Sequence, residues 1–166
     1  MLAGYPELQT YLDHADHLDV KRIEARTSLR QFIAGMLTFH PWWLRQLYCL
    51  RALLVCLLGL EKHENLRHLP SIEPQSLPFT PGATVSFFTV QAAREADYWV
   101  AQTPPDKHLT AFLGVAAVPL PSGAVRFSVF TAVRYLHWTG PVYFNLIRPF
   151  HHLVVRRMMK AGSKTF

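Results

Sequence analysis

The spacing of apolar residues changes character in the last quarter of the chain. Between Val125 and Tyr135 apolar residues recur at every second position, which is the period of a half-buried strand. After a turn-like stretch at residues 138–141, apolar residues recur at helical spacing from Tyr143 to Met158. The pattern predicts a strand followed by a long amphipathic helix, whose apolar stripe lies against a sheet.

The N-terminal half predicts one strand and two helices. His17–Arg26 is a plausible first strand, and Ser28 is a good N-cap for a helix over Leu29–Thr38. Pro41 fits the first position of a second helix, where its missing N–H costs nothing. We expect that helix to end at Gly59, a typical C-terminal stop.

The second half predicts a run of antiparallel strands. Residues 63–82 contain four prolines and are expected to form an extended connector. Short turn-rich segments then separate four predicted strands: Thr84–Ala92, Asp97–Gln102, Leu109–Val118 and Ala124–Tyr135. The third of these is apolar on both faces, as a central strand covered on both sides would be. Strands grouped beside helices indicate an α+β fold rather than alternating βαβ units.

The composition is that of one globular domain spanning residues 1–166. Half of the residues are hydrophobic and 17% are charged, which excludes a disordered chain. The longest strongly apolar run, Ala52–Leu60, is far shorter than the roughly 20 residues of a membrane-spanning helix. Cys49 and Cys56 would lie about 10 Å apart on one helix face, too far for a disulfide. Free thiols and the lack of a signal sequence predict a cytoplasmic protein.

The chain is basic, with a formal net charge of +6 that is concentrated near the C-terminus. Cationic residues at the C-terminus of a helix are favoured by the helix dipole, which is a structural explanation for this concentration of charge. A basic face formed by Arg148, Arg156 and Lys160 is the alternative, and it would dock on an acidic partner or touch a membrane surface peripherally. No nucleic-acid motif accompanies the charge, so no nucleic-acid partner is expected.

Several short motifs resemble a known family. They are Asp16 before the first strand, Pro41-Trp42 with Leu47, Leu50-Arg51, Leu58-Gly59-Leu60, Tyr143-Phe144 through Ile147, Pro149-Phe150-His151 and Val154-Val155. Their order resembles the family catalogued as domain of unknown function 2867, within the START and Bet v 1-like (SRPBCC, polyketide cyclase-like) superfamily. This resemblance implies a helix-grip fold, a curved antiparallel sheet wrapped around a long C-terminal helix with two helices after the first strand. It implies an apolar cavity between sheet and helix in many relatives, but no settled reaction.

Histidines are the main candidates for chemistry. The segment Asp13–Asp19 packs five potential ligands together, but no recognised zinc spacing is present and no metal is expected. His151 borders the apolar stripe, between Ile147 and Val154. There it either acts as an acid or base, or forms a hydrogen bond with a neighbouring backbone group or Tyr hydroxyl and helps to hold the helix in place. Pro149 either begins the main helix or kinks it, so that the preceding turn acts as a flap.

The leading hypothesis is a binding protein for a hydrophobic small molecule, such as a lipid, a polyketide-like compound or another apolar metabolite, held between the sheet and the C-terminal helix. No cofactor is expected. The alternatives are a cyclase- or isomerase-like enzyme that uses a pocket His or Tyr, and the basic-faced interaction module. The predicted pocket walls are Phe112, Phe127, Val129, Thr131, Tyr143, Ile147, Phe150 and Val154, with His151 as the polar contact.

Overall fold

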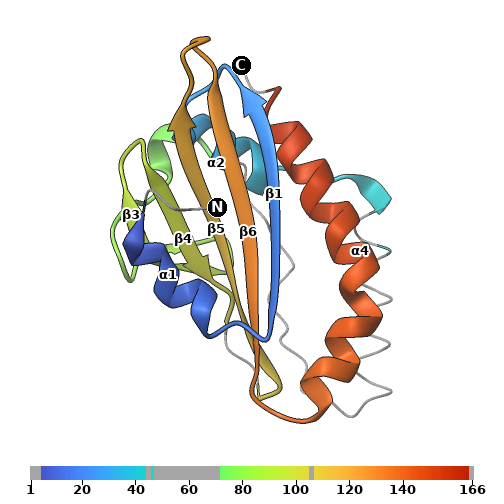
Figure 1. Ribbon diagram of the computed structural model, residues 1–166. Helices are drawn as coiled ribbons and strands as arrows, with labels where there is room; N and C mark the ends of the chain where they lie inside the picture. The colour runs from blue at the N-terminus through green and yellow to red at the C-terminus, as the bar shows by residue number, and fades with distance from the viewer. Residues whose placement is uncertain (1–4, 44–45, 47–71, 105–106, 165–166) are drawn as a thin grey trace.

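The framework of the protein is one antiparallel sheet of six strands. The computed structural model describes residues 5–43, 46, 72–104 and 107–164. Within the sheet the strands follow the order β1-β6-β5-β4-β3-β2, so the first and the last strands of the chain are neighbours (Figure 1). The strands are β1 (His17–Ala25), β2 (Thr84–Val85), β3 (Phe88–Arg94), β4 (Tyr98–Gln102), β5 (Leu109–Pro119) and β6 (Val125–Tyr135). The predicted α+β class and antiparallel sheet are confirmed.

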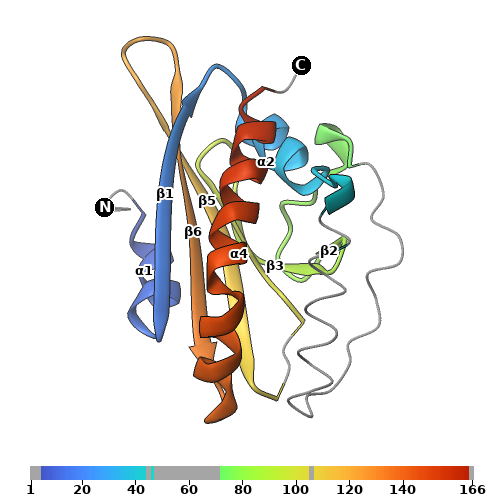
Figure 2. The same cartoon turned by 90° about the vertical axis from the view of Figure 1, so that its right-hand side faces the viewer.

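Two of the described helices cover one face of this sheet. The 24-residue helix α4 (Thr139–Gly162) runs along β1 and β6, and α2 (Leu29–Leu37) lies beside its C-terminal end (Figures 1 and 2). The rings of Phe32 on α2 and Phe127 on β6 stack with their centroids 4.1 Å apart. A curved sheet holding a long C-terminal helix is the predicted helix-grip fold, which is therefore confirmed.

Local sequence explains the first strand and the first helix of this layer. Along β1, half-buried and exposed residues alternate without interruption, as expected for an edge strand with one covered face. At the start of α2 the Ser28 hydroxyl accepts a hydrogen bond from the Gln31 N–H, and the Gln31 side chain accepts one from the Ser28 N–H. This capping box satisfies two backbone donors, which is why the predicted helix begins where it does.

Some predictions for the middle of the chain lie outside the described residues. Trp42 and Trp43 are helical, as predicted, but residues 44–45 and 47–71 are not described. This gap contains most of the second predicted helix and both cysteines, so the free thiols and the cytoplasmic location stay predictions. The connector is described from Ile72 and includes a short 3-10 turn, η1 (Pro74–Ser76).

The predicted strand Thr84–Ala92 is wrong in one respect, because it is a tight hairpin instead. β2 ends at Val85, the chain turns through Ser86 and Phe87, and Phe88 pairs back with Val85. Ser86 has a φ of 56°, the left-handed conformation that two-residue hairpin turns require. The pattern missed this turn because neither residue is a glycine or an asparagine, the usual signals.

Helix α4 begins earlier than its pattern suggested. The turn-like residues Thr139, Gly140 and Pro141 form its first turn, where a proline is tolerated. The helix continues through Pro149, so Pro149 does not begin it. No helix among the described residues is long and apolar enough to cross a bilayer.

The opposite face of the sheet carries a helix that the sequence patterns did not predict. This helix, α1 (Pro6–Asp13), lies across the strands on the side away from α4 (Figure 1). Its Leu8 is fully buried in a second apolar cluster with side chains such as Val100 and Phe130. Leu8 is the only buried residue of α1, so a helix of eight residues showed no repeating stripe to detect.

Candidate functional site

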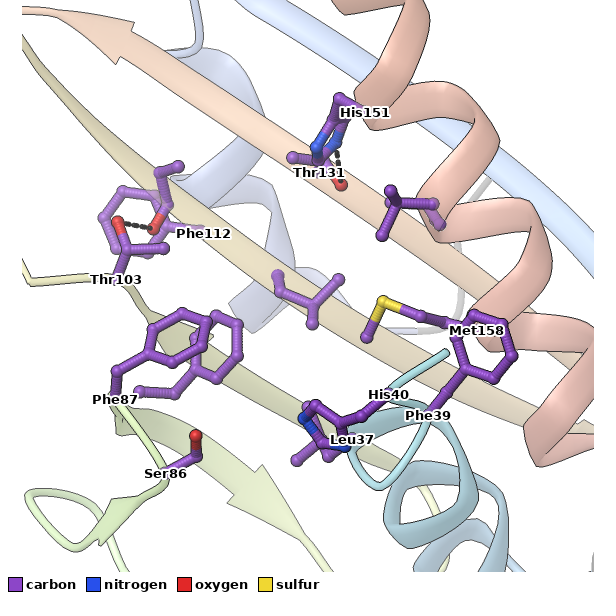
Figure 3. A pocket seen from close by; sticks show the side chains of 15 residues that line it. Leu37, Phe39, His40, Ser86, Phe87, Thr103, Phe112, Thr131, His151 and Met158 are labelled. Atoms are coloured by element: carbon purple, nitrogen blue, oxygen red, sulfur yellow. Dashed lines mark hydrogen bonds between the residues drawn. The ribbon is translucent and has the colours of Figure 1, made fainter. Parts of the chain in front are cut away.

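A cavity of about 190 Å³ lies between the sheet and the two helices that cover it. Its described walls come from six places in the chain. These are Leu37 with residues 39–40 at and just after the end of α2, the β2–β3 turn at residues 86–88, Thr103 just after β4, residues 111–113 of β5, Thr131 on β6, and the second half of α4 from His151 to Met158. Figure 3 shows these side chains around the hollow, with His151 and Thr131 on one side and Leu37 and Ser86 on the other.

The lining is mainly apolar, with a few polar side chains among the rings and alkyl groups. Some of these polar groups are already bonded: the Thr103 hydroxyl donates to the carbonyl of Ala111 at 3.3 Å, and His40 Nδ1 lies 2.8 Å from the Thr38 carbonyl. The apolar part of the wall comprises Leu37, Phe39, Phe87, Phe88, Ala111, Phe112, Leu113, Val154, Val155 and Met158. Such a wall with few polar groups is typical of small-molecule sites.

His151 and Thr131 form the polar contact at one end of the cavity. His151 projects from α4 toward the sheet, and its Nε2 lies 3.3 Å from the Thr131 hydroxyl oxygen (Figure 3). Thr131 is 4% exposed, and His151 is half-buried. The two groups can bond each other and still offer a ring nitrogen or a hydroxyl to a third group.

The environment of His151 keeps its imidazole uncharged. Burial, with smaller contributions from the neighbouring His152, Lys21 and His17, lowers its pKa from 6.5 to about 4. The neutral ring is therefore the dominant form near pH 7, when one nitrogen donates and the other accepts. A neutral histidine can bond a hydroxyl, a carbonyl or an N–H, but it brings no charge to a carboxylate.

An ion-pair cluster lies next to His151, between β1 and α4. Lys21 contacts the carboxylate of Asp19. His152 Nδ1 lies 3.1 Å from Asp19 Oδ2 and 3.0 Å from Lys21 Nζ. Burial lowers the pKa of His152, and Lys21 lowers it further. A neutral His152 accepting from Lys21, which in turn pairs with Asp19, satisfies these groups together.

Four of the predicted wall residues border the cavity. These are Phe112, Thr131, Val154 and His151. Phe112 does so only from the edge, because its ring packs against Tyr11 of α1, with centroids 5.3 Å apart, in the cluster on the opposite face. The register explains this: Leu113 pairs with Thr131, so the next residue back, Phe112, projects to the other side of the sheet.

The other five predicted wall residues lie elsewhere. Phe127 and Val129 are buried in the solid core beneath α2, and Tyr143 is buried near the start of α4. Ile147 is half-buried outside the cavity wall, and Phe150 is 40% exposed on the outer side of the helix. The cavity is thus displaced toward the C-terminal half of α4 relative to the predicted position.

The predicted apolar stripe of the C-terminal helix and the face of α4 that is buried differ by a rotation about the helix axis. This rotation explains the displacement of the cavity. The predicted stripe ran through Phe150 and Val154, whereas the buried face of α4 runs through Phe144, Val155 and Met159. One residue corresponds to about 100° around a helix, so this offset turns Phe150 outward.

Sequence reasoning also missed most of the cavity wall. Phe39, His40, Ser86 and Phe87 come from a helix end and a hairpin turn, which carry no periodic signal. One local signal for this part of the wall is the pair Phe87-Phe88. Adjacent residues of a strand point to opposite faces, so only one of the two rings can pack on a given face of the sheet.

The polar segment before β1 has structural partners. Asp13 accepts a hydrogen bond from the Gln9 side chain at 2.6 Å, and Asp16 accepts one from the Tyr135 backbone N–H at 2.7 Å. Among the described residues, no three His, Cys, Asp or Glu side chains gather closely enough to hold a metal ion.

Comparison with known families now places the chain. A family model described as protein of unknown function (DUF2867) matches residues 11–158. The chain belongs to the DUF2867 family. The match includes the whole cavity wall of this DUF2867 protein, from Leu37 to Met158. No curated protein matches the chain.

Solved structures of similar shape are distant in sequence from this DUF2867 chain. Norcoclaurine synthase from Thalictrum flavum is 14% identical, with 93% of this chain and 89% of that chain covered and a TM-score of 0.46. Ara h 8.0201 is 8% identical, with coverage of 88% and 97% and a TM-score of 0.43. A hypothetical protein from Helicobacter pylori is 10% identical, with coverage of 96% and 95% and a TM-score of 0.44. Matches of this kind support no functional argument.

Proposed function

We propose that the protein binds a small, neutral, largely apolar molecule in the cavity between the sheet, α2 and α4. The observation that carries this proposal is the cavity itself, a mainly apolar wall with the part-buried His151–Thr131 pair at one end. An apolar hollow with a small number of placed polar groups favours a ligand of the same character.

The size of the cavity limits the ligand. Its volume of about 190 Å³ compares with roughly 150 Å³ for an engineered apolar cavity that takes up benzene. Drug-sized sites are larger, about 300–1,000 Å³. One aromatic ring, two fused rings or a short aliphatic chain therefore fits the described walls.

The polar end limits the charge of the ligand. An uncharged His151 bonds a hydroxyl, a carbonyl or an N–H group of a bound molecule. A carboxylate in the same place would lose its hydration and gain no cation from His151, which is unfavourable. Phenols, alcohols and indole-like rings are thus preferred over their acid analogues.

Catalysis is not part of the proposal. A histidine with a pKa of about 4 is a weak base near neutral pH. The described residues of the wall include no Asp, Glu or Tyr that would act with it. The pair is better suited to orienting a ligand than to moving a proton.

Binding of matched probes by two variants of neighbouring residues tests the proposal. Val154 lines the cavity, whereas Leu153 is 45% exposed on the outside of the same helix. Val154→Phe fills the hollow, so indole and benzyl alcohol should bind at least about tenfold more weakly than to the wild type, a difference of about 1.4 kcal/mol. Leu153→Phe, the matched control, should bind them as the wild type does, measured by titration calorimetry.

The same titrations include indole carboxylate and benzoate. These acids should bind the wild type more weakly than their neutral counterparts. If the neutral probes do not bind the wild type, or if Val154→Phe binds them as tightly as the wild type does, the cavity is not a binding site for such molecules.

A further inference from the structure

The outer face of α4 carries large apolar side chains in contact with solvent. Val142, Leu146, Phe150 and Leu153 are 54%, 48%, 40% and 45% exposed. Their spacings of four, four and three residues place them on one side of the helix, and we call them the outer stripe. Trp138, just before the helix, is 75% exposed. Single exposed apolar residues are ordinary, but a contiguous row of them marks a contact surface.

The fold does not need this stripe for its core. The opposite side of α4 buries Tyr143, Phe144, Val155 and Met159 against the sheet and α2. The helix is thus apolar on two sides. Figure 2 looks at the side on which α4 forms the outermost layer over β1 and β6.

Positively charged side chains follow the outer stripe toward the C-terminus. Arg156, Arg157, Lys160 and Lys164 follow Leu153 and are all exposed, and we call them the basic end. No ion pair joins any of them to another described residue. The chain has no Asp or Glu after Asp106, so α4 itself brings no negative charge to balance them. The outer face therefore has an apolar half and a cationic half.

We propose that the outer face of α4 docks on the surface of an anionic lipid bilayer. Charge complementarity selects this occupant, because the basic end would meet lipid phosphates while the outer stripe enters the boundary between headgroups and acyl chains. Trp138 sits where an interfacial aromatic residue is favoured. The helix is held parallel to the sheet, so its whole length can lie in the plane of the membrane.

This inference does not rest on the proposed ligand. It uses the outer side of α4, whereas the cavity uses the inner side through His151, Val154 and Met158. Either can fail without the other.

Co-flotation of the full chain with vesicles tests the docking. The wild type should float with vesicles that contain about 30% phosphatidylglycerol in phosphatidylcholine, and not with phosphatidylcholine alone. Binding should fall at least about fivefold when salt rises to about 0.5 M, because exposed charges are screened.

Two double variants with the same chemical changes make the test specific to α4. Leu146→Ser with Arg157→Gln removes one apolar and one cationic group from the outer face. Leu18→Ser with Arg22→Gln makes the same change on β1, where both residues are exposed on the face of the sheet away from α4. Both variants alter exposed positions, and circular dichroism verifies that they fold.

The α4 variant should lose at least about fivefold of its vesicle binding, and the β1 variant should bind as the wild type does. The proposal is overturned if the wild type does not float with the anionic vesicles, as would be the case for a face that serves an acidic protein instead. It is equally overturned if both variants bind alike.

Discussion

His151 illustrates how burial decides the properties of one side chain. Its burial makes the charged imidazolium unfavourable, and the neighbouring His152 and Lys21 act in the same direction. The group is therefore a neutral hydrogen-bonding partner at the end of the cavity. This property also links His151 to the stability of the fold.

We expect His151 to make the protein less stable in mild acid. Its folded pKa of about 4 lies below the unfolded value near 6.5, so the unfolded chain binds the proton more readily. The free energy of unfolding should be unaffected above about pH 7 and should fall by roughly 2 kcal/mol near pH 4.5 on account of this group. Urea unfolding of the wild type and of His151→Asn at both pH values measures the difference.

Other histidines separate this effect from general acid sensitivity. Burial also lowers the pKa of His17 and His152, so some loss of stability in acid should persist in His151→Asn. His14→Asn, at an exposed position, should behave as the wild type does. Equal acid sensitivity of His151→Asn and wild type would show that His151 is not desolvated in the folded protein.

At the scale of elements, the contact of α4 with α2 depends on a glycine. A Cβ atom at Gly162 would lie 2.4 Å from the carbonyl oxygen of Phe32 and 3.2 Å from the Phe32 ring. The two helices therefore approach through backbone rather than side chains. The last residue of α2, Leu37, lines the cavity.

Gly162→Ala should destabilise the protein although alanine favours helices. The gain in helix propensity is about 0.5–1 kcal/mol, whereas forcing the helices apart costs about 1–3 kcal/mol, so a net loss is expected. Arg157→Ala, at an exposed position of the same helix, is the control and should change stability by less than about 0.5 kcal/mol. Thermal unfolding of both variants gives the comparison, and a more stable Gly162→Ala would contradict the close packing of α2 on α4.

At the scale of the whole molecule, the sheet is covered on both faces. Helices α2 and α4 cover one, and α1 covers the other through Leu8, which is fully buried. Tyr5, beside α1, donates a hydrogen bond from its hydroxyl to the carbonyl of Ala117 at 2.9 Å. The N-terminal segment is therefore part of the fold rather than an appendage.

Leu8→Ala tests the contribution of α1 to global stability. Removing a buried leucine side chain should lower the free energy of unfolding by about 2–5 kcal/mol. Leu12→Ala, at a half-buried position of the same helix, should cost less. Urea unfolding followed by circular dichroism measures both, and a cost below about 0.5 kcal/mol for Leu8→Ala would mean that α1 is not docked on the sheet.

The sequence by itself determined the elements whose signals are local. The N-cap at Ser28, the alternation in β6 and the helical spacing after Pro141 each depend on residues a few positions apart. Together with the family resemblance, these signals were enough to predict the helix-grip fold. The short α1 and the turn at Ser86 escaped because neither carries a repeating pattern.

Only the tertiary structure decided where the cavity lies and what its polar end can do. Periodicity predicts the spacing of apolar residues in α4 but not which of two apolar sides faces the sheet. The predicted pocket wall therefore includes Phe150, which is exposed in the structure. The described cavity wall is assembled from six separated segments, and the pKa of His151 depends on its burial and on neighbours that include Lys21 and His17 of β1. Such properties arise from long-range packing and desolvation, which no local stretch of sequence encodes.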